Sequence, residues 1–389
     1  MISILVLIYV VFISLGLPDS VFGVAWPVVH TEFGIAESFA SIYSIITGIC
    51  SGGASFVAGI VLRKFGTPKV TFFSILLTAI GLIGMSFSPN IWVMMLFAVV
   101  MGYGAGAIDT GLNNYVSLHF KARHMSWLHA FWGVGVTLSP AIMSAFLGGE
   151  QGNWRNGYRV LAVIQFAIAA AVGIMLPKWI KKDKESSQKY IEESEKKKLK
   201  LSNFKGLLPS ILALGFYCSM EFIVGTWGAS YAVNVYSIGA DTAARWVSVY
   251  FGGIMTGRLL SGFVSDKLGD NNMIRIGAVA SFVGMLILIL PIGSKALIGL
   301  FFIGLGFGPV FPSVLHAVPS RFGKEFSADL TGFHMGGAYA VGFTFQLNLG
   351  YAATGTTFKI VPYVLAALLC LMTVCNEAAI KQAERNFSN

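Results

Sequence analysis

Acidic and amide side chains stand inside a segment that is otherwise apolar enough to cross a membrane. Residues 102–114 read Gly-Tyr-Gly-Ala-Gly-Ala-Ile-Asp-Thr-Gly-Leu-Asn-Asn, with Asp109 and Asn113 four residues apart. This spacing places both on one face of a helix. A carboxylate at the centre of a lipid-spanning helix costs at least about 2.5 kcal/mol, so Asp109 must face protein or water. The segment is predicted either to bind a solute or coupling ion, or to form a buried polar clip between helices.

Two further acids, Asp19 and Glu221, stand in apolar stretches of the same kind, and Pro18 directly precedes the first of them. Proline removes a backbone donor, which loosens a helix at that point. Acids inside membrane segments face a cavity or a partner by default. Glycines 102, 104 and 106 lack side chains, so they let a neighbouring backbone or a solute come close.

The composition predicts a polytopic membrane protein. Hydrophobic residues make up 55% of the chain and charged residues 12%, with a mean hydropathy of +0.72. The net charge of +9 does not indicate a nucleic-acid partner, because the basic residues occupy short gaps between apolar runs. The lipid bilayer is the expected surroundings, and the four cysteines lie within apolar stretches without metal-ligand spacing.

Twelve apolar runs have about the 20 residues that a bilayer core requires. They are expected near 3–28, 36–62, 69–87, 91–118, 125–147, 157–177, 207–233, 242–265, 273–291, 295–316, 327–348 and 357–379. With both termini in the cytosol, cytosolic gaps and tail hold 21 Lys and Arg residues against 5 on the opposite side. This asymmetry predicts that orientation in the plasma membrane.

The chain is expected to consist of two six-helix halves, residues 1–177 and 207–389, joined by a charged cytosolic linker over 178–206. The halves repeat at a nearly constant offset. Glycines 102, 104 and 106 return as 304, 306 and 308, and Asp19 returns as Glu221, both at 202 residues. Duplicated halves place a binding site at their interface.

The whole chain resembles the major facilitator superfamily. Its most specific fragment is Gly262-Phe-Val-Ser-Asp-Lys-Leu-Gly269, which is similar to the loop signature of that superfamily, and Gly262, Asp266, Lys267 and Gly269 are the expected gating loop. The physical sense of the signature is a tight turn whose acid pairs with a base and meets a helix N-terminus, latching one state. The first-half copy departs from it because Arg63 takes the place of the usual acid.

Within the superfamily, Asp109-Thr-Gly-Leu-Asn113 resembles the fourth helix of the fucose–proton symporter family, and Asp19 falls at its other membrane carboxylate. The stretches 216–227 and 308–312 resemble its seventh and tenth helices, and sodium-coupled glucose carriers share these features. The resemblance implies twelve helices, of which the first, fourth, seventh and tenth line a central cavity. It also implies that Asp109 is the coupling or proton-accepting carboxylate, and that Asp19 binds the substrate or cation.

Sugars present apolar ring faces and a rim of hydroxyl groups, which aromatic planes and amides complement. The candidates for these contacts, together with Glu221, are Trp26, Trp227, Tyr231, Asn113, Asn114, Asn234, Gln346 and Asn348. The alternative for the tryptophans is an interfacial anchor, and for Glu221 a bond to a neighbouring helix. His129 and its repeat partner His334 either relay protons or pack as neutral rings. Arg258, two turns before the loop, is expected to be structural, snorkelling or pairing with Asp266.

The sequence therefore predicts a secondary transporter that imports a sugar or similar small polar solute with H⁺ or Na⁺. The resemblance implies a fold that can work as a monomer. We expect no metal or other cofactor, since the sequence carries no zinc spacing, nucleophile elbow or Walker loop. The alternatives are an exporter of apolar compounds or lipids, and a membrane sensor that does not transport. An intramembrane enzyme has no catalytic grouping to support it.

Overall fold

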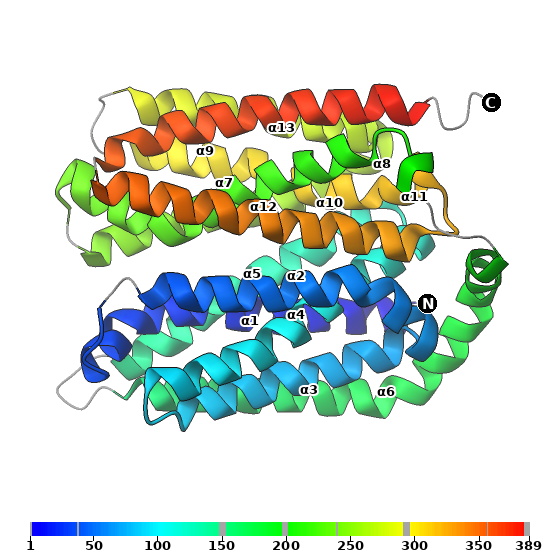
Figure 1. The fold of residues 1–389 in the computed structure, drawn as a ribbon, viewed down its shortest axis with the longest axis horizontal. Coiled ribbons are helices and arrows are strands. Elements are labelled where there is room, and N and C mark those ends of the chain that lie inside the picture. Colours follow the sequence, from blue (N-terminus) through cyan, green and yellow to red (C-terminus); the bar gives the residue numbers. More distant parts are fainter. Residues whose placement is uncertain are drawn as a thin grey trace. The chain divides into compact units, whose positions relative to one another are not determined.

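The computed structural model describes residues 2–36, 39–147, 153–196, 201–238, 240–290, 296–355 and 357–384 (Figure 1). Every regular element within these ranges is helical. The first part of the chain forms α1 (Ile2–Glu32), α2 (Phe39–Phe65), α3 (Thr67–Ser86), α4 (Ile91–His119), α5 (Ala122–Leu147) and α6 (Trp154–Lys196). The remainder forms α7 (Leu207–Tyr236), α8 (Ala240–Ile289), α9 (Ala296–Phe307), α10 (Val310–His316), α11 (Val318–Phe322), α12 (Ser327–Gly355) and α13 (Val361–Ala383), with short 3-10 turns η1 (Leu201–Asn203) and η3 (Phe358–Ile360).

The predicted spans correspond closely to these helices. Nine helices in the described part of the chain are long and apolar enough to cross a membrane. Two predicted spans, 242–265 and 273–291, lie in the single element α8, which turns at Gly269. The predicted tenth span, 295–316, is divided between α9 and α10. The all-helical membrane fold expected from the sequence is confirmed.

The predicted linker begins as a continuation of a helix. α6 runs through Pro177 and ends at Lys196, so most of the residues from 178 onward extend the sixth span. Lysine and glutamate, which are frequent here, are good helix formers, and this offsets the cost of one interior proline. Residues 197–200 of the linker lie outside the described ranges, and so do the side chains of 184–196.

The helices form two compact units. The first consists of Met1–Tyr115, Phe131–Lys198 and Ala328–Gly332, and the second of Val116–Ala130, Leu199–Ser327 and Phe333–Asn389. In the first, α3 packs along α6, and α1 packs against α6 as well (Figure 1). In the second, α9 packs against α8, and α13 lies along α7. Each unit has its own apolar core, which includes Trp154 and Tyr158 in the first and Tyr217 and Tyr250 in the second.

The repeated glycines are points of helix contact. A Cβ atom on Gly106 of α4 would lie 2.2 Å from the backbone oxygen of Ser51 in α2. A Cβ on Gly304 of α9 would lie 2.1 Å from the backbone oxygen of Tyr250 in α8. Both glycine series therefore allow one helix backbone to touch another, which is the packing that small residues permit in membranes. Of the two roles predicted for them, approach of a backbone is the one observed.

Two further glycines carry the tight turns. Gly66, between α2 and α3, has φ 78°, and Gly269, between the two arms of α8, has φ 75°. Only glycine adopts this region freely, because it has no Cβ. The two positions are 203 residues apart, so the repeat extends to the backbone conformation of each loop. The predicted tight turn at the loop signature is confirmed.

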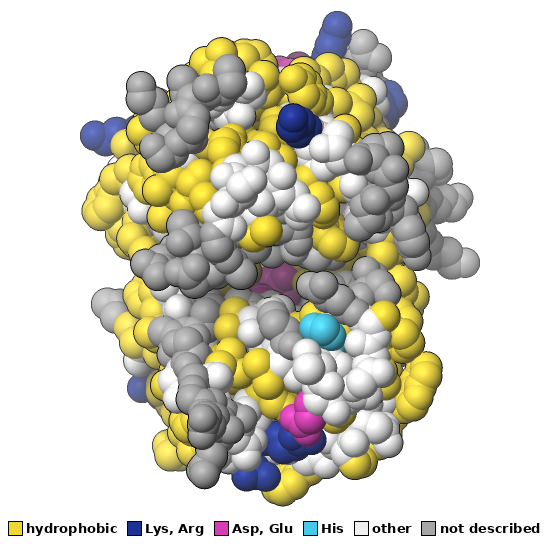
Figure 2. Space-filling view, turned by 90° about the vertical axis from the view of Figure 1, so that its left-hand side faces the viewer, with side chains coloured by type: hydrophobic (Ala, Val, Ile, Leu, Met, Phe, Trp, Pro, Cys, Tyr) yellow, Lys and Arg dark blue, Asp and Glu magenta, His cyan; other side chains and the backbone are white. Residues whose placement is uncertain are grey.

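Hydrophobic side chains cover much of the face seen in Figure 2. Large apolar side chains are exposed on many of the helices, among them Ile49, Trp92, Ile174 and Phe263. A soluble protein rarely exposes so much contiguous apolar surface, whereas lipid tails accommodate it. The surface fits a protein that is surrounded by a bilayer.

Candidate functional site

Asp109 and Asn113 lie together on α4, as predicted. The Asn113 Nδ2 atom donates a hydrogen bond to Asp109 Oδ1 at 2.6 Å and a second to the Asp109 backbone oxygen at 2.9 Å. Both side chains are buried, and Asn114 beside them is buried too. The amide thus satisfies part of the hydrogen-bonding capacity that the carboxylate loses when it leaves water. An acid held in this way inside a spanning helix has the chemistry of a proton or cation acceptor.

Asp19 lies in α1 and keeps access to its surroundings. Its side chain is exposed, and its Oδ2 atom accepts a hydrogen bond of 2.7 Å from Trp132 Nε1 of α5. The indole N–H is a neutral donor that cannot accept. The carboxylate is therefore oriented without being neutralised by this contact. Sequence reasoning gave Trp132 no role, because two helices that are far apart in the chain create the contact.

The contact follows from close packing of α1 on α5. A Cβ on Gly16 would lie 2.3 Å from the Trp132 backbone oxygen, and one on Gly135 would lie 2.1 Å from the Ile13 backbone oxygen. The Ser20 hydroxyl donates to the Val136 backbone oxygen at 2.9 Å. Small residues on both helices thus bring the Trp132 indole within hydrogen-bonding distance of Asp19.

Glu221, the repeat partner of Asp19, has a different environment. Its Oε2 atom lies 3.8 Å from Arg258 Nη2 of α8, and the arginine side chain is only 2% exposed. Arg258 also donates to the His129 backbone oxygen at 3.3 Å, and its Nη2 atom lies 3.5 Å from the Tyr217 hydroxyl. The expected partner Asp266 is replaced here by Glu221. Glu221 is thus neutralised by a buried cation, whereas Asp19 is held by a neutral group.

Both candidate histidines are buried. The His129 ring packs edge-on against Phe311 with the centroids 4.9 Å apart. His334 Nε2 and the Ser210 hydroxyl are 2.8 Å apart, so one donates to the other. These contacts suit packed rings, and a role in proton relay or substrate binding remains a prediction.

The structure brings together Trp227 and Gln346 from the set predicted to bind a sugar. Trp227 Nε1 of α7 donates to the Gln346 backbone oxygen of α12 at 3.0 Å. The Gln346 side chain donates to the Thr226 hydroxyl at 2.9 Å. This group of aromatic plane and amide lies next to Phe358, whose ring centroid is 6.2 Å from that of Trp227.

Other members of that set are dispersed. Trp26 is buried in the apolar core of the first unit, where its ring packs on Phe22. Tyr231 is buried with its hydroxyl 3.3 Å from that of Tyr236. Asn234 is exposed, and the exposed Asn348 amide donates to the Thr344 backbone oxygen at 2.8 Å. Binding roles for these residues remain predictions.

The signature loop engages the start of α5. Asp266 accepts a hydrogen bond from the Arg123 backbone N–H at 3.2 Å, and its Oδ2 atom lies 3.5 Å from Arg123 Nε. Gly262 leaves room for Trp127, since a Cβ there would lie 2.1 Å from the indole nitrogen. Lys267 is exposed. Asp266 therefore pairs with a base and meets a helix N-terminus, as the signature predicts.

The first-half loop forms its own ion pair with the charges exchanged. Arg63, which stands in place of the usual acid, binds the carboxylate of Asp329 at the start of α12. Gly59 leaves the space for that residue, because a Cβ there would lie 2.2 Å from Asp329 Oδ1. Residues 328–332 belong to the same compact unit as α2. Sequence reasoning noted the substitution of Arg63 and missed Asp329.

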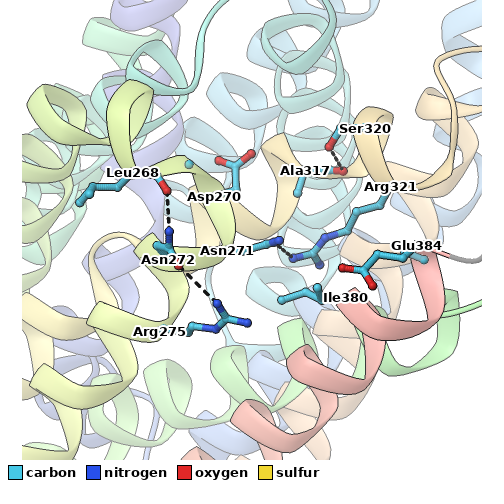
Figure 3. Close-up of a pocket in the computed structure, with 12 residues that line it drawn as sticks. Leu268, Asp270, Asn271, Asn272, Arg275, Ala317, Ser320, Arg321, Ile380 and Glu384 are labelled. Carbon is cyan, nitrogen blue, oxygen red and sulfur yellow. Dashed lines mark hydrogen bonds between the residues drawn. The ribbon is translucent and has the colours of Figure 1, made fainter.

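A cavity of about 510 Å³ lies beside the second signature loop, lined by α8, Ala317, α11 and the end of α13 (Figure 3). Arg321 is buried here, and its Nη2 atom donates to Asn271 Oδ1 at 2.7 Å. Burial lowers the pKa of the Arg321 guanidinium to about 10, so it remains charged at neutral pH. Of the predicted site residues, only Gly269 lines this cavity.

These observations define a class: an all-helical membrane protein with many membrane-length apolar helices and with carboxylates inside them. Residues 8–346 match the sequence profile of the Major Facilitator Superfamily. The chain belongs to this superfamily and is a membrane transporter of the secondary class, not an enzyme.

The chain is similar to characterised transporters over most of its length. It is 22% identical to the sialic acid transporter NanX of Escherichia coli K12, covering 89% of this chain and 86% of NanX. It is also 22% identical to the glucose/mannose transporter GlcP of Bacillus subtilis 168, covering 85% and 82%. The structure of the Escherichia coli fucose:proton symporter FucP in the outward conformation superposes with a TM-score of 0.78 at 12% identity, covering 96% of this chain and 98% of FucP. The resemblance and the fold predicted from the sequence are confirmed.

Proposed function

We propose that this chain imports a sugar or a similar small polar solute, coupled to H⁺ or Na⁺, by alternating access. The observation that carries the proposal is the accessible carboxylate of Asp19, which is held in a spanning helix by the neutral indole of Trp132. A carboxylate inside a spanning helix is energetically costly, and the indole contact does not neutralise it. Such an acid is suited to exchange a proton or cation. The buried Asp109 supplies a second acid in the same unit.

The names of the relatives support the choice of substrate class. They transport sialic acid and glucose or mannose, and the similar solved structure is a fucose:proton symporter. Each of these substrates is a sugar with a hydroxyl rim. The half-buried Trp227 ring, held by its bond to the Gln346 backbone oxygen, supplies an aromatic face for such a molecule. No described contact favours the exporter or the sensor over this function.

We also propose that the 178–206 linker and the 262–269 loop face the cytosol. The excess of Lys and Arg over all the segments on this side, 21 against 5, supports this orientation. Single cysteines at Lys184 and Lys267, introduced into a variant without the four native cysteines, should react with an impermeant maleimide only after cells are opened. Labelling of intact cells at either position would contradict the orientation.

The test of function is uptake by purified protein in liposomes. A panel of labelled neutral hexoses, a deoxyhexose and sialic acid is offered under an inward proton gradient and then an inward sodium gradient. We expect one gradient to drive accumulation of at least one sugar, and Asp19→Asn to abolish the accumulation. Absence of uptake of the entire panel by folded protein would contradict the proposal.

A further inference from the structure

Trp132 lies at the point where α5 determines the environment of Asp19. Its Nε1 atom donates to Asp19 Oδ2 at 2.7 Å, while the carboxylate side chain stays exposed. An indole N–H can only donate, so it bonds well to an ionised carboxylate and poorly to the protonated oxygen of an acid. A hydrogen bond to a charged acceptor is also stronger than a neutral one. The contact therefore favours the ionised form of Asp19 and fixes its direction.

The indole is itself held in place. Gly16 and Gly135 bring the backbones of α1 and α5 into contact, and Ser20 bonds to the backbone of the turn after Trp132. These contacts set the register of the two helices within one turn of the Asp19–Trp132 bond. A small shift between α1 and α5 would change the length of that bond directly.

Tyr43 of α2 interacts electrostatically with Asp19, and its phenol does not ionise near neutral pH. The repeat partner Glu221 contrasts with this, because Arg258 lies beside it. Asp19 thus receives a hydrogen bond from a neutral donor on another helix, whereas Glu221 lies beside a cation.

We propose that Trp132 is a positioning residue for coupling, which holds Asp19 ionised and makes its protonation sensitive to the register of α1 and α5. This inference rests on the proposed function, in which Asp19 binds the coupling ion. Trp132 makes no contact with the transported solute in this role. Trp132 sets the pH range over which Asp19 takes up a proton and does not set the affinity for the solute.

The first test is the pH profile of uptake in Trp132→Phe. Removing the donor makes Asp19 accept a proton more readily, so the midpoint of the profile should move to higher pH by about one unit. The KM for the solute at saturating proton concentration should stay within twofold. Trp132→Gln, which keeps an N–H donor, should restore most of the midpoint. Trp92→Phe, a change of an exposed indole in α4, should leave the profile unchanged.

A second test needs no transported solute. Tryptophan emission of the purified protein is followed as the pH is varied, in the wild type, Trp132→Phe and Asp19→Asn. We expect a pH-dependent component in the wild type that both variants lack. Such a component with no uptake of any solute would remove the proposed function and leave the positioning role intact. Equal emission titrations in the three proteins, or an unmoved pH profile in Trp132→Phe, would overturn the inference.

Discussion

Arg63 binds Asp329, and Gly59, one helical turn earlier, leaves the space in which the aspartate lies. The second signature loop makes the matching pair with the charges exchanged, since Asp266 binds Arg123. The replacement of the usual acid by Arg63 is therefore compensated on its partner helix. Each loop retains one ion pair to the start of a helix.

Charge reversal tests this compensation. Arg63→Asp or Asp329→Arg alone places like charges together and should lower the free energy of unfolding by about 1–3 kcal/mol, because the pair is partly buried. The double variant should recover at least half of the loss. Thermal unfolding in detergent measures both. Arg123→Ala, which breaks the more exposed pair, is the control and should cost about 1 kcal/mol or less. Additive losses in the double variant would show that the pair is not coupled.

The Glu221–Arg258 pair should matter more for stability than any exposed pair. Glu221→Gln leaves a buried guanidinium without its counter-charge and should destabilise the protein by about 3–5 kcal/mol. Replacing both residues by methionine should recover much of this, since apolar groups of similar volume often substitute for a buried pair. The matched control in the same unit is Glu377→Gln, which breaks an exposed pair with Arg275 and should leave the free energy of unfolding close to that of the wild type. Equal losses in the two single variants would contradict the expectation.

Asp109→Asn should separate coupling from folding. The asparagine oxygen can still accept from Asn113 Nδ2, so the local hydrogen bond at 2.6 Å persists in the variant. The group can no longer take up or release a proton. We expect gradient-driven accumulation to fall at least tenfold while exchange of labelled for unlabelled solute continues. Accumulation equal to that of the wild type would remove Asp109 from the coupling role.

Trp227 offers a test of the aromatic contact. Trp227→Ala should raise the KM by up to about tenfold if its ring stacks on the solute, in keeping with about 0.5–1.5 kcal/mol for an aromatic contact. Trp227→Phe keeps a ring and loses the bond to the Gln346 backbone, so it should raise the KM less than threefold. Concentration dependence of initial uptake measures this. An unchanged KM in the alanine variant would identify the residue as an anchor.

The periodic pattern of apolar runs determined the helices, because only helices satisfy the backbone of a single segment in lipid. It also determined that Asp109 and Asn113 share a face, since their contact is local to α4. The internal repeat identified Asp19 and Glu221 as equivalent positions, and the loop signature predicted that Asp266 pairs with a base. Each of these features depends on residues close together in the chain or on a constant offset.

Only the tertiary structure decided the partners of those charges. Asp19 meets Trp132 across 113 residues, and Glu221 meets Arg258 on another helix. Arg63 finds its acid 266 residues away. Such pairs depend on the packing distance and rotation of two helices, which small residues such as Gly16 and Gly59 set at the contact. A sequence shows that an acid in the membrane needs a partner, and the packing of helices determines which residue that partner is.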